Sequence, residues 1–134
     1  MKRVSVLVAC ALPIVASAAH PTPATLHGRF FGTLPAAACV SQDVLLALHA
    51  DGHYVLQAHC QDDLQATPIR RGDWSVTWNG TCVRLTSEHG DDRALEFAIH
   101  DDDLLVLTAG SCVEPVEDPR GRTLRRATED RGRD

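Results

Sequence analysis

Lysine is nearly absent from this chain of 134 residues, in which Lys2 is the only one. The segment 20–113 holds five arginines against twelve aspartates and glutamates. It contains no basic stripe of the kind that binds nucleic-acid phosphates, which argues against that class of function. The favoured interpretation of this acidic surface is that it keeps the protein soluble; attraction of metal cations by the acidic groups and the six histidines between residues 27 and 100 is the alternative.

Catalytic motifs are absent as well. The sequence has no Gly-x-Ser-x-Gly, no His-Glu-x-x-His, no phosphate-binding loop, and no Ser or Cys nucleophile with an obvious orienting base. We therefore expect that the protein is not an enzyme. Its length is sufficient for one domain and not for two.

An apolar run opens the chain. Lys2 and Arg3 precede residues 4–19, which are almost wholly apolar, and Ala16-Ser17-Ala18 is a small-x-small cleavage site. This pattern indicates a secretory signal peptide over residues 1–19, too short and too rich in alanine for a retained membrane span. We therefore expect an exported, periplasmic protein.

A lipoprotein signal is the alternative, because Leu7-Val8-Ala9-Cys10 has the letters of a lipidation site. Only six residues would separate Arg3 from Cys10, whereas a signal peptide usually has an apolar region of roughly 7–15. Cleavage after Ala18 or Ala19 fits better. An outer-membrane lipoprotein anchored at Cys10 is the second interpretation.

No later stretch has helical periodicity. Short segments rich in Val, Leu, Thr and aromatic residues alternate with turn residues at spacings of about 8–12, which is typical of an all-β barrel or sandwich. We expect strands near 27–33, 43–49, 53–60, 69–78, 81–87, 93–100 and 103–108. Consecutive hairpins of this kind predict a small antiparallel up-and-down barrel or half-barrel of about six to eight strands.

The turn between His49 and His53 sets the first register. Gly52 follows Asp51 and is expected to take the left-handed conformation of a three-residue hairpin loop. The cross-strand pairs that follow are Leu48 with Tyr54, Leu46 with Leu56, Val44 with Ala58, and Gln42 with Cys60. They give one continuous apolar face.

The dipeptide Asn79-Gly80 predicts a second hairpin with a type I′ turn. It pairs Trp78 with Thr81 and Val76 with Val83, and strand alternation then places Trp74 and Trp78 on the apolar face. Tyr54 belongs to the same interior. These three aromatic side chains, Tyr54, Trp74 and Trp78, either fill the barrel or line a pocket for a small apolar ligand.

The C-terminal residues 114–134 carry six arginines and six acidic residues. We expect this charged tail to be largely disordered, with Thr123-Leu124-Arg125 as a candidate for a short closing strand. The folded domain is then residues 20–113.

The order of several short motifs resembles the NlpE N-terminal domain family over about residues 28–110. The motifs are Gly32-Thr33-Leu34-Pro35, Asp51-Gly52 with Tyr54, Gly72-Asp73-Trp74, Val83-Arg84-Leu85 and Asp103-Leu104-Leu105. This resemblance implies a lipocalin-like barrel in the bacterial envelope. It also implies a role in copper homeostasis or envelope-stress signalling, with copper as the cofactor and an envelope protein as the partner.

One motif departs from the family. Its members have Leu-Pro-Cys-x-x-Cys, but here Leu34-Pro35 is followed by Ala36, so only the second cysteine, Cys39, is kept. The family's candidate pair for a soft metal or a redox switch is therefore broken.

Four cysteines remain in an exported chain: Cys39, Cys60, Cys82 and Cys112. An even number in an oxidising compartment predicts two disulfides, and three pairings are possible. The hairpin register brings Cys60 close to Cys39, which favours Cys39–Cys60 and leaves Cys82–Cys112. The second pair requires the segment after Gly110 to cross the outer wall of the barrel, and the other pairings stay open.

His49 and His53 are the candidate metal ligands. As a cross-strand pair their Cβ atoms lie roughly 5 Å apart, close enough for both imidazoles to hold one Cu(II) or Zn(II), with Asp51 nearby. Closed sites usually need three or four ligands, so exposed polar residues beside a turn are the other interpretation.

Three functions follow from these patterns. The first is a non-catalytic envelope-stress or copper-homeostasis protein, and the second is a barrel that binds a small apolar ligand. The third is a periplasmic interaction or inhibitor module that uses the loop "PAAACVSQD", residues 35–43, clamped by a disulfide.

Overall fold

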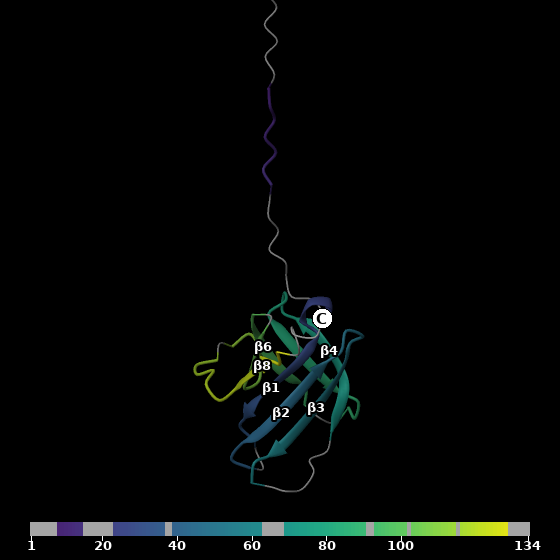
Figure 1. Cartoon of the computed structure of the whole chain (residues 1–134), viewed down its shortest axis with the longest axis vertical. Coiled ribbons are helices and arrows are strands. Elements are labelled where there is room, and N and C mark those ends of the chain that lie inside the picture. Colours follow the sequence, from purple (N-terminus) through teal and green to yellow (C-terminus); the bar gives the residue numbers. More distant parts are fainter. Residues whose placement is uncertain are drawn as a thin grey trace, which may run out of the picture.

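A computed structural model describes residues 8–14, 23–36, 39–62, 69–90, 93–101, 103–114 and 116–128. Its body is a closed antiparallel barrel in which each strand pairs with the next and the last strand pairs with the first (Figure 1). The eight strands are β1 (Gly28–Leu34), β2 (Gln42–Leu48), β3 (His53–Cys60), β4 (Arg70–Thr77), β5 (Cys82–Ser87), β6 (Leu95–Asp101), β7 (Leu104–Leu107) and β8 (Thr123–Arg126). The predicted all-β up-and-down barrel is confirmed.

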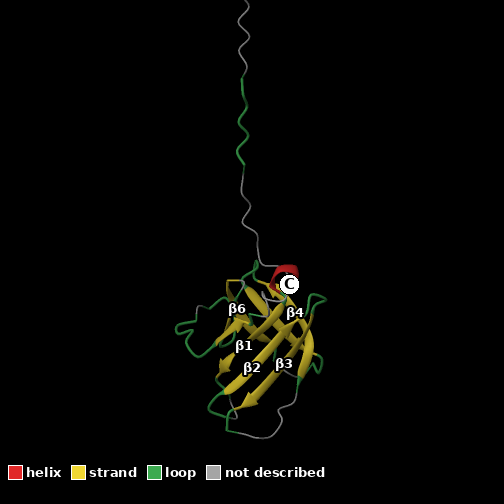
Figure 2. Ribbon diagram, in the orientation of Figure 1, coloured by secondary structure: helices red, strands yellow, loops and turns green. Residues whose placement is uncertain are grey.

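A single helical turn, α1 (Pro23–Leu26), precedes β1. Figure 2 shows it at one end of the barrel, here called the upper end. The β2–β3, β4–β5 and β6–β7 turns lie at the upper end, and the strand ends joined by the other connections lie at the lower end. Both ends matter below, because each disulfide closes a different part of the barrel.

The N-terminal signal peptide predicted over residues 1–19 falls largely on residues outside the described part of the chain. The described stretch 8–14 is exposed and has no regular secondary structure. No helix in the described residues is long and apolar enough to cross a membrane.

The register predicted from the Asp51-Gly52 turn is confirmed. Leu48 pairs with Tyr54, and Gln42 pairs with Cys60, while Gly52 has a φ of 92°. Alternation of side chains along these strands then points every second residue inward. The register of this turn therefore determines which residues form the core.

The interior is filled by side chains from all eight strands and from α1. Its buried members are Leu26, Phe30, Leu34, Val44, Leu46, Leu48, Tyr54, Leu56, Trp74, Val83, Leu85, Phe97, Leu105 and Leu124. Cross-strand neighbours such as Trp74 and Leu85, or Val83 and Phe97, continue the apolar layer around the barrel. Burial of this apolar surface is the main force that holds the strands together.

The prediction that Trp78 faces the interior is wrong. Val76 does pair with Val83 as expected, and the backbone N–H of Thr81 donates to the Trp78 carbonyl at 3.2 Å. Trp78, however, already has a φ of 52°, ahead of Asn79 at 55°. Left-handed backbone at this residue ends the strand alternation, and the indole is turned out, with 54% of Trp78 exposed.

The prediction of a largely disordered tail from residue 114 is corrected over part of its length. Residues 123–126 form β8, as the Thr123-Leu124-Arg125 candidate allowed, and Leu124 is fully buried in the core. The end of the tail, residues 129–134, lies outside the described residues. The barrel domain therefore extends beyond residue 113 to the end of β8.

Arg126 closes the barrel at the upper end. Its Nε lies 3.0 Å from the Asp103 carboxylate, its Nη1 donates to the His27 carbonyl at 2.8 Å, and its Nη2 donates to the Leu26 carbonyl at 3.4 Å. The guanidinium also lies over the Phe30 ring, 4.8 Å from its centroid. One charged group thus joins β8 to α1, to β1 and to the β6–β7 turn.

Gly32 lets β8 approach β1. A Cβ at this position would overlap the carbonyl oxygen of Thr123 and crowd Leu124. Because the clash involves backbone of the closing strand, it cannot be relieved by rotating a side chain. This explains why a glycine stands at the centre of β1.

We predict that Gly32→Ala lowers the free energy of unfolding by roughly 1–3 kcal/mol, the usual cost of overpacking. Replacing a strand glycine by alanine would otherwise be expected to stabilise by roughly 0.5–1 kcal/mol, so the sign is diagnostic. Gly110→Ala is the matched control, because a Cβ there meets open space. Equal stability of the two variants in denaturant titrations would contradict this account of barrel closure.

Candidate functional site

The Cys39–Cys60 disulfide closes the lower end of the barrel. The two Cα atoms are 6.1 Å apart, within the usual range for this bond. It joins the β1–β2 connection to the end of β3. The preferred pairing from the sequence is therefore confirmed, and so is its partner, Cys82–Cys112.

A polar network surrounds this first disulfide. The Ser41 hydroxyl donates to the Gln61 side-chain oxygen at 3.0 Å, and the Gln61 amide donates to the Asp43 carboxylate at 3.1 Å. The Thr33 hydroxyl donates to the same carboxylate oxygen at 2.8 Å. These hydrogen bonds, Thr33 first, hold the pKa of Asp43 below its usual value.

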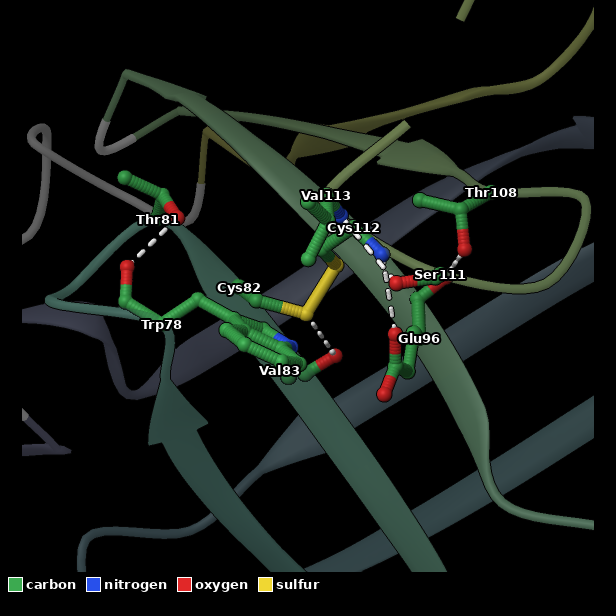
Figure 3. Close-up of a disulfide and its surroundings, with 9 residues drawn as sticks. All are labelled: Trp78, Thr81, Cys82, Val83, Glu96, Thr108, Ser111, Cys112 and Val113. Carbon is green, nitrogen blue, oxygen red and sulfur yellow. Dashed lines mark hydrogen bonds between the residues drawn. A yellow bond between two sulfur atoms is a disulfide. The ribbon is translucent and has the colours of Figure 1, made fainter. Parts of the chain in front are cut away.

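The Cys82–Cys112 disulfide lies on the outside of the barrel wall (Figure 3). Cys82 begins β5 at the upper end and alternates with the inward-facing Val83. The chain after β7 starts at the lower end and runs back over the outer wall to bring Cys112 within 5.8 Å of Cys82, measured between Cα atoms. This is the crossing that the pairing required.

Glu96 on β6 holds the crossing segment in place. Its carboxylate Oε2 accepts the backbone N–H of Cys112 at 2.9 Å. Its backbone carbonyl accepts both the N–H and the hydroxyl of Thr108, at 3.0 and 3.1 Å. The segment is thus fixed to the wall by hydrogen bonds as well as by sulfur.

A second, smaller buried cluster forms beneath this segment. Cys82, Ala98 and Val106 are successive partners across β5, β6 and β7 on the outer face, and both Cys82 and Val106 are fully buried. Alternation along β7 assigns Val106 to solvent, so sequence analysis did not identify it. The one signal for its burial was the need for Cys112 to reach Cys82.

The structure places His49 and His53 beside each other at the upper end. The backbone N–H of His49 donates to the His53 carbonyl at 2.9 Å, as the predicted pairing requires. The imidazole Nδ1 of His53 lies 2.9 Å from the Asp73 carboxylate, which was not foreseen. Asp51 instead accepts the backbone N–H of His53 at 3.0 Å.

This arrangement gives His53 the orientation of a metal-binding histidine. A carboxylate on one ring nitrogen fixes the imidazole and leaves the other nitrogen for a cation. Within the described ranges, however, no group of three ligating atoms includes His49 or His53. Both histidines are exposed to solvent.

The three aromatic candidates for a ligand pocket do not share a cavity. Tyr54 and Trp74 are buried and pack within the core, where the Trp74 indole N–H donates to the His49 carbonyl at 2.8 Å. Trp78 lies outside. Tyr54 and Trp74 thus act as core residues.

An open hollow of about 740 Å³ lies along β1, β2 and β3. Its exposed apolar residues are Phe31, 52% exposed, and Ile69, 46% exposed. Leu45 is the cross-strand partner of Phe31 and continues the apolar surface, while Asp43 and His59 form its polar edge. Exposed apolar patches of this kind commonly mark interaction sites.

Comparison with known proteins gives one family and one fold. A sequence model of the NlpE N-terminal domain matches residues 30–113. The crystal structure of a "putative lipoprotein" from Shewanella oneidensis superposes with a TM-score of 0.60 at 18% identity, covering 77% of this chain and 90% of the other. No curated protein matches significantly. Together with the two disulfides, these findings support an envelope-associated protein.

We predict that the Asp43 carboxyl titrates below its usual pKa, and that Thr33→Val raises that pKa by removing the nearest hydrogen bond. Because the pKa is lowered in the folded protein, the stabilisation is present above the unfolded pKa and is lost as the pH falls through the lower, folded value. Carboxyl NMR titration measures this. Thr86→Val, on β5, is the control and should leave Asp43 unchanged. A usual pKa for Asp43 in the unmodified protein would refute the prediction.

Proposed function

Because the chain belongs to the NlpE N-terminal domain family, we propose that it is a non-catalytic protein of the bacterial envelope that acts in copper homeostasis or the envelope-stress response. The match over residues 30–113 is the observation that carries this proposal. The closed barrel and the two disulfides agree with it, since an exported domain of this size gains from covalent cross-links. The chain carries no catalytic motif, which fits a binding role.

We further propose that the protein is periplasmic, with the signal peptide removed after Ala18 or Ala19. The described leader residues 8–14 are all exposed. Cys10, the one free cysteine among the described residues, is the alternative attachment point for lipid. The name of the structural neighbour, a lipoprotein, favours testing both.

Mass spectrometry of the protein from an expressing bacterium distinguishes the two forms. We expect a chain that begins at Ala19 or His20, lacks four hydrogens for two disulfides, and fractionates with the periplasm. A Cys10→Ser variant should behave identically. A membrane-bound product that starts at Cys10 and carries the added mass of acyl chains would contradict the periplasmic proposal.

Copper would bind at His49 and His53 in this proposal, with Asp73 orienting His53. The supporting geometry is the 2.9 Å contact between His53 Nδ1 and the Asp73 carboxylate and the pairing of the two histidines across the turn. The exposed position suits transient capture of Cu(II), for which imidazole is a good ligand. Two imidazoles without a third protein ligand predict modest affinity.

We predict that His49→Ala/His53→Ala abolishes Cu(II) binding by the oxidised protein in calorimetric titration. Asp73→Asn should weaken binding by about ten- to a hundredfold, as is usual when the group that orients a metal-binding histidine is lost. His59→Ala is the control, because His59 lies on the outer face at the other end of β3. If the unmodified protein binds copper no better than the double variant, the metal role at this turn is wrong.

A protein-interaction module is the second candidate. The hollow along β1, β2 and β3, with its exposed Phe31 and Ile69, favours it. The Cys39–Cys60 disulfide also clamps the loop that sequence analysis nominated as an inhibitory loop. Loss of copper binding with retention of an envelope-stress phenotype would favour this second candidate.

A further inference from the structure

The two disulfides differ in what surrounds them. At the Cys82–Cys112 pair, both sulfur atoms and a carboxylate oxygen of Glu96 all lie within 4.8 Å of one another. Nowhere else in the described part of the chain do three such ligating groups gather. At the Cys39–Cys60 pair, the Cys39 sulfur lies 3.3 Å from the Ser41 carbonyl, and the Ser41 hydroxyl donates to the Gln61 side chain.

The three groups are positioned independently of the sulfur–sulfur bond. Cys82 and Glu96 stand on paired strands, since Cys82 pairs with Ala98 and Glu96 pairs with Arg84. Cys112 is held to Glu96 by its own N–H. Figure 3 shows the Glu96 side chain pointing toward the segment that carries Cys112. Opening the disulfide would therefore leave both sulfurs beside the carboxylate.

We propose that reduction of the Cys82–Cys112 disulfide creates a binding site for a thiophilic cation, held by the two cysteine thiolates and the Glu96 carboxylate. Two thiolates beside a carboxylate repel one another, and a soft cation relieves this repulsion. Thiolates select Zn(II), Cd(II) and Cu(I), and three protein ligands leave a fourth position for water. This site goes beyond the proposed copper role, because it requires the reduced protein and involves neither His49 nor His53.

The reaction starts with a dithiol reductant. Cys82 is fully buried and Cys112 is partly exposed, so the attacking thiolate reaches the Cys112 sulfur and displaces the Cys82 thiolate. The second thiol of the reductant then attacks its own sulfur in the mixed disulfide and releases Cys112, so that the reductant leaves as a disulfide. Two electrons have passed to the protein. Binding of the cation then releases to solvent the protons that the two thiols carry.

The test is a Cd(II) titration of the full chain, followed by the ultraviolet cadmium–thiolate charge-transfer band. Every variant tested carries Cys10→Ser. Except in the oxidised sample, a phosphine keeps Cys39, Cys60, Cys82 and Cys112 reduced and does not compete for the metal. We expect one Cd(II) per chain with two thiolates. Glu96→Gln should bind at least about tenfold more weakly, since even loss of a group that only orients a metal ligand costs that much. The oxidised protein should show no band.

Cys82→Ser/Cys112→Ser is the matched control, because after reduction it also carries two thiols, Cys39 and Cys60, which form no three-ligand group with a carboxylate among the described residues. It should lose the band. Equal binding by this control, or by Glu96→Gln, would overturn the proposed site. Circular dichroism shows whether the reduced chain is folded, and a reduced chain that is unfolded and does not refold with Cd(II) would also overturn it. Because copper binding at His49 and His53 is measured on oxidised protein, either proposal can fail alone.

Discussion

Closure of the barrel depends on one guanidinium. Only two registered pairs, Phe30 with Arg126 and Phe31 with Arg125, join β1 to β8, so this seam has fewer backbone contacts than the β1–β2 seam beside it. Arg126 compensates by binding carbonyls before β1 and the Asp103 carboxylate after β6. The Arg126 side chain is 23% exposed and that of Asp103 is 69% exposed, so the guanidinium itself is partly shielded from water while the ion pair lies at the surface. Without the seam, the interior of the barrel would open to solvent.

The long connection between β7 and β8 adds a second layer of chain outside the barrel wall. Between β7 and β8 the chain passes over the outer wall, and that passage buries Val106 and Cys82 on a face that a simple barrel leaves exposed to solvent. The disulfide to Cys112 and the Glu96 hydrogen bonds fix the passage in one place. A protein with a small core thus gains a second apolar cluster.

Strand positions and registers were predictable because they depend on local rules. Asp51-Gly52 fixed the pairing that leads from Leu48–Tyr54 to Gln42–Cys60, and that pairing in turn identified one disulfide. Trp78 was missed because left-handed backbone begins one residue before the Asn-Gly pair. Arg126 and Glu96 were missed for another reason: their partners are brought together by barrel closure and by the crossing segment, which no periodic pattern in the sequence encodes. Asp73 was missed because it meets His53 across β3 and β4, whose long connection does not fix their register.

The loss of one family cysteine decides where thiol chemistry can occur in this chain. With Ala36 in the first position, the loop of Cys39 has no second cysteine at the family's position. Cys39 instead bonds to Cys60 at the end of β3, where the side chains of Ser41 and Gln61 hydrogen-bond to each other. The only described free thiol, Cys10, lies outside the barrel. Any soft metal bound by cysteine within the barrel must therefore follow reduction of a disulfide. Among the described residues, Cys82–Cys112 is the disulfide whose sulfurs form a three-ligand group with a carboxylate, so metal binding there would report the redox state of the envelope.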